Sequence, residues 1–223
     1  MAYFPMKLRP GRGREKRYRL RARLSASFVA VFVYSIPTFG FAHDARDAFT
    51  RGTWQSGLAG GYARGFAAFD SGGSESEDVR MGALFASAGA SLTDSIAPGR
   101  WFGGGVSLLG EGQFLWNREP RDGFGGSGAL VVRYHFLASA RHGVVPFLDG
   151  GAGVGAIDFD LESQHDGFNF ILEGGVGVHL FLTPVLALTP SWRYHHISNA
   201  GTARPNVGIN SQLFLLGINL FFP

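Results

Sequence analysis

Residues 168–182 read FNFILEGGVGVHLFL and carry the clearest alternation in this sequence. Every second position from Phe168 to Leu182 is apolar or glycine, whereas Asn169, Glu173 and His179 lie at positions between them. Successive side chains of a β-strand point to opposite faces, so this period of two indicates a strand with one apolar face. The last segment repeats the pattern, with one face made of Phe214, Leu216, Ile218, Leu220 and Phe222.

Segments of the same kind, separated by polar turns, follow one another along the chain. Eight strands are expected, at residues 54–69, 79–92, 101–117, 124–137, 144–160, 167–182, 185–198 and 209–222. The predicted fold class is all-β, an eight-stranded antiparallel transmembrane β-barrel. A narrow barrel needs small residues inside, and we expect these glycines to face inward: Gly103, Gly105, Gly151, Gly153, Gly155, Gly175 and Gly177. A soluble β-barrel is the alternative.

Composition and charge exclude several classes of protein. The 223 residues include 34 glycines and no cysteine, which excludes a disulfide framework and a cysteine metal site. Residues 1–42 hold nine of the 20 basic residues and one of the 17 acidic residues. The remainder is therefore acidic, which argues against nucleic-acid binding through bulk charge.

The N-terminus has the layout of an export signal. An arginine-rich segment, residues 7–23, precedes the apolar run 24–41, and Gly40-Phe41-Ala42 supplies small residues at a cleavage site. We expect residues 1–42 to be a signal peptide and residues 43–223 to be the outer-membrane barrel domain. A single transmembrane anchor is the alternative, and translation could start at Met1 or at Met6.

The connections between the expected strands predict an orientation. If the first strand rises from the periplasm, the polar connections 70–78, 117–123, 161–166 and 199–208 face outside, and the tight connection 182–184 faces the periplasm. Longer outer loops and short inner turns are typical of outer-membrane barrels. The connection 93–100 is longer than this pattern favours.

Residues with reactive side chains lie at the end of the seventh expected strand. His196 and Ser198 are two apart, so both side chains point to one face, about 6.5 Å apart along the strand. Parity places them on the outer, lipid-facing side together with Asn210 of the last strand. A serine beside a histidine is the minimum for a nucleophile activated by a general base. Alternatively, these side chains only solvate an interfacial strand end.

The remaining polar residues suit structural roles. His135, His179 and His195 are expected to form hydrogen bonds in the lumen, and Glu173 and Arg193 to belong to an internal polar network. Because His195 and His196 point to opposite faces, they cannot chelate one metal ion. We therefore expect no metal site and no cofactor.

The segment His196-Ile-Ser198-Asn199-Ala200-Gly201, followed by Pro205-Asn206-x-Gly208-Ile209, resembles the C-terminal motif of the PagL lipid A 3-O-deacylases. The layout of eight strands with this motif on the last hairpin is also similar. The resemblance implies a Gram-negative outer-membrane esterase that hydrolyses the 3-O-linked acyl chain of lipid A. It implies Ser198 as nucleophile, His196 as base, and Asn206 with Asn199 as oxyanion donors.

The third position of the implied triad departs from the family, which has a glutamate where this chain has Asn210. An amide oxygen can orient the imidazole but supplies no charge to stabilise the imidazolium. Three readings follow: an enzyme that uses Asn210, an enzyme that uses another carboxylate, or an inactive relative. Outside the enzyme class, the alternatives are an OmpA-like structural or adhesion barrel and a barrel that binds or transports an apolar ligand. Acyl-chain length and oligomeric state cannot be inferred from the sequence.

Overall fold

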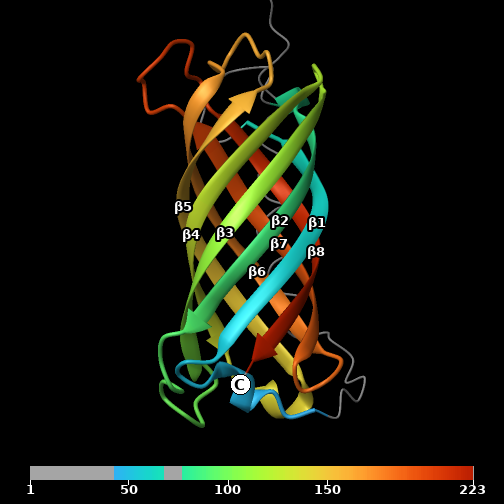
Figure 1. Ribbon diagram of the computed structural model, residues 1–223, viewed down its shortest axis with the longest axis vertical. Helices are drawn as coiled ribbons and strands as arrows, with labels where there is room; N and C mark the ends of the chain where they lie inside the picture. The colour runs from blue at the N-terminus through green and yellow to red at the C-terminus, as the bar shows by residue number, and fades with distance from the viewer. Residues whose placement is uncertain (1–42, 68–76, 223) are drawn as a thin grey trace, which may run out of the picture. The chain divides into compact units, whose positions relative to one another are not determined.

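The computed structural model describes residues 43–67 and 77–222 of the chain. Each strand pairs antiparallel with the next, and β8 pairs back to β1 to close a barrel (Figure 1). The strands are β1 (Trp54–Gly65), β2 (Arg80–Ser91), β3 (Gly104–Glu119), β4 (Gly123–Phe136), β5 (Val144–Asp158), β6 (Gly167–Phe181), β7 (Leu186–Ser198) and β8 (Ile209–Phe222). The predicted eight-stranded antiparallel barrel is confirmed. The expected signal peptide lies outside the described residues.

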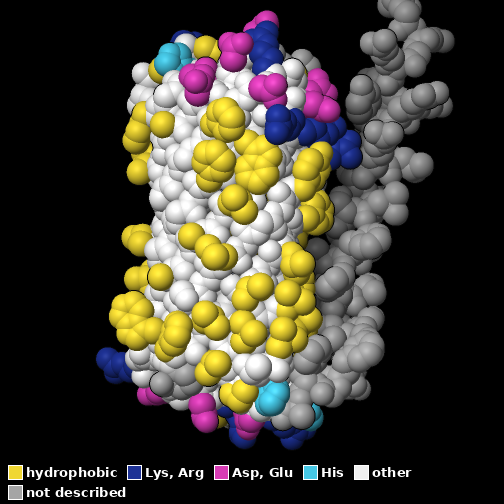
Figure 2. Space-filling model, turned by 45° about the vertical axis from the view of Figure 1, so that its right-hand side comes forward, with side chains coloured by type: hydrophobic (Ala, Val, Ile, Leu, Met, Phe, Trp, Pro, Cys, Tyr) yellow, Lys and Arg dark blue, Asp and Glu magenta, His cyan; other side chains and the backbone are white. Residues whose placement is uncertain are grey.

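The two-residue period of the sequence separates the lumen from the outer surface. In β6, Asn169, Glu173 and His179 are buried inside, whereas Phe168 and Leu172 are exposed outside. Exposed apolar side chains cover the middle of the outer surface, and charged side chains gather at its two ends (Figure 2). Such an apolar band is typical of barrels that cross a membrane with their strands. None of the helices in the described part of the chain is long and apolar enough to span a membrane.

Three of the glycines expected inside the barrel, Gly151, Gly175 and Gly177, make room for large lumen side chains, whereas Gly103 precedes β3 and lies in no strand. A Cβ atom on Gly151 would lie 2.9 Å from the Glu173 Oε1 atom, and one on Gly175 would lie 2.6 Å from the Arg193 Cγ atom. The strand ends differ from the prediction by a few residues. The first strand ends at Gly65, and the third begins only at residue 104, because Gly103 lies in a turn and donates its N–H to the Arg100 carbonyl.

Three layers of side chains fill the lumen. The upper layer, on the side of the loop 199–208, is apolar, and it includes Met81, Phe85, Leu115, Phe159, Ile171, Ile197, Ile209 and Leu213. The middle layer is polar, and the lower layer is a cluster of aromatic and small apolar residues. Phe49 belongs to the lower layer and comes from the short 3-10 helix η1 (Arg46–Phe49), which precedes β1. Its ring lies 4.4 Å from that of His135 and 5.1 Å from that of Phe221, centroid to centroid.

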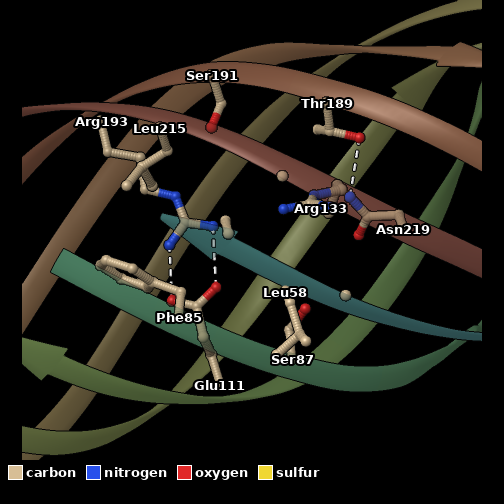
Figure 3. A pocket seen from close by; sticks show the side chains of 13 residues that line it. Leu58, Phe85, Ser87, Glu111, Arg133, Thr189, Ser191, Arg193, Leu215 and Asn219 are labelled. Atoms are coloured by element: carbon tan, nitrogen blue, oxygen red, sulfur yellow. Dashed lines mark hydrogen bonds and ion pairs between the residues drawn. The ribbon is translucent and has the colours of Figure 1, made fainter. Parts of the chain in front are cut away.

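The middle layer is an ion cluster around Arg193, and Figure 3 shows Arg193 paired with one of its partners, Glu111. Arg193 contacts Glu111 at 2.7 Å, Asp149 at 3.0 Å and Glu173 at 3.2 Å, measured between nitrogen and oxygen atoms. Arg133 pairs with Asp149 at 2.7 Å. The cavity beside the cluster has a volume of about 30 Å³, which is room for about two water molecules. The predicted internal network of Glu173 and Arg193 is confirmed, and the packed layers do not favour transport of a ligand through the described lumen.

The hairpin connections alternate between the two ends of the barrel. Residues 66–67, 77–79, 120–122, 159–166 and 199–208 lie at the upper end, and residues 92–103, 137–143 and 182–185 at the lower end. The N-terminal segment joins the lower end, where the Ala45 N–H donates to the Ala140 carbonyl. The loop 199–208 therefore lies at the upper end, beside the connection 159–166.

Candidate active site

The upper ends of β7 and β8 bring His196 and Asn210 together. These two residues are direct cross-strand partners, and both side chains point away from the lumen. The His196 Nδ1 atom lies 2.8 Å from the Asn210 Oδ1 atom, and Asn210 is only 3% exposed. An amide oxygen accepts hydrogen bonds only, so the proton of the imidazole belongs on Nδ1 in this arrangement. The Nε2 lone pair is then available as a base.

Ser198 shares the outer face with His196, at the last position of β7. Its cross-strand partner on β6 is Phe170, an exposed aromatic residue. The Ser198 hydroxyl makes no hydrogen bond to any residue that the structure describes. The strand therefore brings Ser198 and His196 onto one face, two residues apart, without a hydrogen bond between them.

The loop 199–208 is stabilised by its own asparagines. The Asn206 Oδ1 atom accepts a hydrogen bond from the Asn199 N–H at 2.9 Å, and the Asn199 Oδ1 atom accepts one from the Gly201 N–H at 2.9 Å. Asn199 follows the last residue of β7 and is fully buried, and its side-chain hydrogen bond to the Gly201 N–H shapes the turn. Asn206 is partly exposed, and its Nδ2 group makes no hydrogen bond within the described residues. The Asn206 amide group is therefore available as a hydrogen-bond donor in the loop 199–208.

The connection 159–166, between β5 and β6, contacts the loop 199–208 and stabilises it. The Gln164 Oε1 atom accepts a hydrogen bond from the Gly208 N–H at 2.9 Å, and its Nε2 group donates to the Asn169 Oδ1 atom at 2.8 Å. Backbone hydrogen bonds from His165 to Pro205 and from Val207 to Ser163 join the same two loops. The sequence analysis missed Gln164, because it lies more than thirty residues before the motif and within no pattern.

Tyr194 is a further residue that the sequence analysis did not assign to the site. Its hydroxyl donates a hydrogen bond to the Asn210 Oδ1 atom at 2.6 Å. The available signal was its position, since Tyr194 lies two residues before His196 on the same face of the same strand.

A shallow apolar groove follows the outer surface across β3–β6, below Ser198. It is formed largely by small residues between larger apolar ones: Gly110, Gly128, Leu130, Ala152, Val154 and Phe170. Phe170, one of the residues that line the groove, is the cross-strand partner of Ser198.

The other histidines lie in the lumen, as predicted. His195 contacts Gln113 at 3.1 Å, His135 contacts Ser107 at 3.0 Å, and His179 contacts Thr189 at 2.8 Å. Within residues 43–67 and 77–222, no three acidic or histidine side chains cluster in a way that could hold a metal ion.

A sequence profile described as Lipid A 3-O-deacylase (PagL) matches residues 17–219, which is most of the chain. The chain belongs to the PagL family. The matched span includes His196, Ser198, Asn199, Asn206 and Asn210. No curated protein matches the chain by sequence.

Two solved structures have a similar fold. The outer membrane enzyme PagL has a TM-score of 0.52 and 20% sequence identity, and the match covers 74% of this chain and 98% of that one. Neisserial surface protein A (NspA) has a TM-score of 0.53 and 18% identity, and covers 76% of this chain and 96% of its own. At these identities the likeness establishes the shared barrel fold, and a function has to be argued from the site.

Proposed function

We propose that this chain is an outer-membrane hydrolase that removes the 3-O-linked acyl chain of lipid A through Ser198 and His196. The observation that carries the proposal is the hydrogen bond of 2.8 Å between the His196 Nδ1 and Asn210 Oδ1 atoms, on the same face as Ser198. It leaves Nε2, the nitrogen on the far side of the ring, to serve as the base. Membership of the PagL family supports the substrate class.

The proposed reaction has two halves. As the Ser198 Oγ atom attacks the ester carbonyl, its proton passes to His196 Nε2, and negative charge develops on the carbonyl oxygen. The C–O bond to the sugar then breaks, and His196 returns the proton to the departing sugar oxygen. A water molecule attacks the acyl-serine in the same way and releases the fatty acid. The Asn206 Nδ2 group is the proposed side-chain donor to the oxyanion.

The surroundings of the site suit a lipid substrate. The site opens to the outer surface near the upper rim, so a lipid A molecule in the surrounding membrane leaflet reaches it sideways. The groove that Phe170 helps to line offers an apolar surface for an acyl chain, because small residues line its floor. The packed lumen gives no such route.

Asn199 fits a supporting position in this proposal. Its backbone N–H donates to the Asn206 carboxamide oxygen, which leaves the Nδ2 group of Asn206 as the available donor. We assign Asn206 the donor role and Asn199 the role of holding the loop.

We also propose that residues 1–42 are a signal peptide and that the upper end faces the cell exterior. We then expect the acidic loop around residues 70–78 to be accessible on intact cells. If protease treatment of intact cells left an epitope in this loop uncleaved, the proposed orientation would be wrong.

The decisive experiment is mass spectrometry of lipid A from cells that express the wild type, Ser198→Ala or His196→Ala. We expect the wild type to remove one ester-linked acyl chain, and either variant to lose nearly all of this activity. Both side chains lie outside the packed lumen, so both variants should still give the heat-modifiable gel mobility of a folded barrel.

Two results would contradict the proposal in different ways. Substantial activity in Ser198→Ala would reject this serine as the nucleophile. Unchanged lipid A in cells that make folded wild-type protein would reject the activity itself, and would favour a non-enzymatic barrel in which Asn210 marks the loss of the family's carboxylate.

A further inference from the structure

Two donors converge on one atom of Asn210. The Oδ1 atom lies 2.6 Å from the Tyr194 hydroxyl and 2.8 Å from His196 Nδ1. The strand register explains the convergence: His196 is directly opposite Asn210, while Tyr194 is directly opposite Gln212 and therefore diagonal to Asn210. Diagonal neighbours have Cα atoms about 7–8 Å apart, a separation that a tyrosine side chain can bridge.

We propose that Tyr194 is a positioning residue that keeps the Asn210 carboxamide turned with its oxygen toward His196. This proposal rests on the proposed function, because it gives Tyr194 a part in the same esterase site. It also explains how an asparagine can take the place of the family's carboxylate.

An amide differs from a carboxylate in its symmetry. The two oxygens of a carboxylate are equivalent, so either can accept the proton of the imidazole Nδ1 group. A carboxamide has one acceptor and one donor end, and rotation by 180° exchanges them. In the reversed orientation the NH₂ group would face His196, the Nδ1 atom would have to accept, and the proton would move to Nε2. His196 could then no longer take a proton from Ser198.

The Tyr194 hydroxyl opposes this reversal. A phenol donates a strong hydrogen bond but accepts a weaker one, since its oxygen lone pair is delocalised into the ring. Facing the amide oxygen is therefore more favourable than facing the NH₂ group. The tyrosine ring itself is held in place, because it packs edge-on against Phe66 with the centroids 6.0 Å apart. Burial of Asn210 strengthens the preference, since water has little access to the carboxamide.

A double-mutant cycle with Asn210→Asp tests the proposal. Aspartate has the same shape as asparagine but two equivalent oxygens, so it does not need to be oriented. In purified barrels in detergent, we expect Tyr194→Phe to lower kcat for lipid A deacylation by about 5- to 30-fold, which corresponds to one buried hydrogen bond. KM should change little, because the hydroxyl does not face the groove. On the Asn210→Asp background, the same change should alter kcat by less than about twofold.

Tyr62→Phe is the matched control. Tyr62 is an exposed, outward-facing tyrosine of β1 whose hydroxyl makes no hydrogen bond to a described residue. We expect it to leave kcat unchanged. An equal loss from Tyr194→Phe on both backgrounds, or no loss on the asparagine background, would overturn the proposal.

A second readout does not depend on activity. Nitrogen-15 NMR of labelled histidine reports which imidazole nitrogen carries the proton, and the His196 signals are identified by their absence in His196→Ala. We expect the Nδ1–H tautomer in the wild type and a shift toward Nε2–H in Tyr194→Phe. An unchanged tautomer would overturn the role of Tyr194. A wild type that shows the expected tautomer but leaves lipid A intact would instead contradict the proposed function.

Discussion

At the scale of single residues, the position of the His196 ring depends on the absence of a Cβ atom at Gly208. Gly208 has a φ angle of +84°, in the left-handed region that favours glycine. A Cβ atom at this position would lie 2.9 Å from the His196 Cε1 atom, closer than carbon atoms normally approach. The imidazole is thus confined between Asn210 on one side and a bare backbone on the other.

Gly208→Ala should therefore displace the His196 ring. We expect a loss of deacylase activity of about 10²-fold, the scale reported for misplacement of a reacting group by about 1 Å. Gly201→Ala is the control, because Gly201 has a similar φ of +81° but open space around its Cβ position. Both variants carry a backbone strain of about 1–2 kcal/mol, so an equal loss of activity in the two would show that strain, and not contact with His196, is responsible.

At the scale of elements, the candidate site depends on a loop that contributes nothing to its chemistry. The connection between β5 and β6 pairs with the connection between β7 and β8, and Gln164 lies between them at 1% exposure. Its carboxamide satisfies the Gly208 N–H on one side and the Asn169 side chain on the other. A buried donor that loses its partner costs about 1–3 kcal/mol, so removal of this side chain should loosen the loop.

For Gln164→Ala we expect faster hydrogen–deuterium exchange across residues 199–208 and a roughly tenfold lower deacylase activity, with the barrel strands still protected from exchange. Glu162→Ala serves as the control. Glu162 lies in the same connection, but its side chain is exposed and pairs with Arg121, also at the surface. If exchange in the loop were the same in both variants, Gln164 would have no bracing role.

At the scale of the whole molecule, buried charge connects distant parts of the barrel. Arg193 of β7 contacts Glu111 of β3, Asp149 of β5 and Glu173 of β6, and its side chain is 4% exposed. Because these strands lie at different positions around the lumen, the guanidinium group of Arg193 links β7 to β3, β5 and β6. Removing one partner from such a cluster leaves buried charges uncompensated.

Arg193→Met should lower the free energy of unfolding by about 3–5 kcal/mol, measured as a lower denaturant midpoint for the loss of folded-barrel gel mobility. Arg118→Met is the comparison, because its ion pair with Asp122 lies at the surface and contributes about 0–1 kcal/mol. Activity per folded molecule should be similar in both variants, since neither arginine touches the candidate site. A midpoint of Arg193→Met equal to that of the wild type would mean that the cluster adds no net stability.

The amino-acid sequence by itself determined the fold class, the number of strands and the face of each side chain. These are consequences of a local period: alternation of apolar and polar residues is read within one strand, without knowledge of its neighbours. The same parity predicted that His196, Ser198 and Asn210 point outward and that Glu173, Arg193 and His195 point inward. The predicted strand ends differed from the observed ones, as at Gly103, because turn geometry depends on contacts beyond the strand.

Only the tertiary structure decided which of these side chains meet. The hairpin register sets His196 opposite Asn210 and Tyr194 diagonal to it, and the packing of two loops brings Gln164 onto Gly208. Closure of the barrel brings Glu111 to Arg193, 82 residues apart in sequence. Such contacts depend on strand register, on barrel closure and on how loops fold over one another. These properties arise from the whole chain, so no local pattern of residues encodes them.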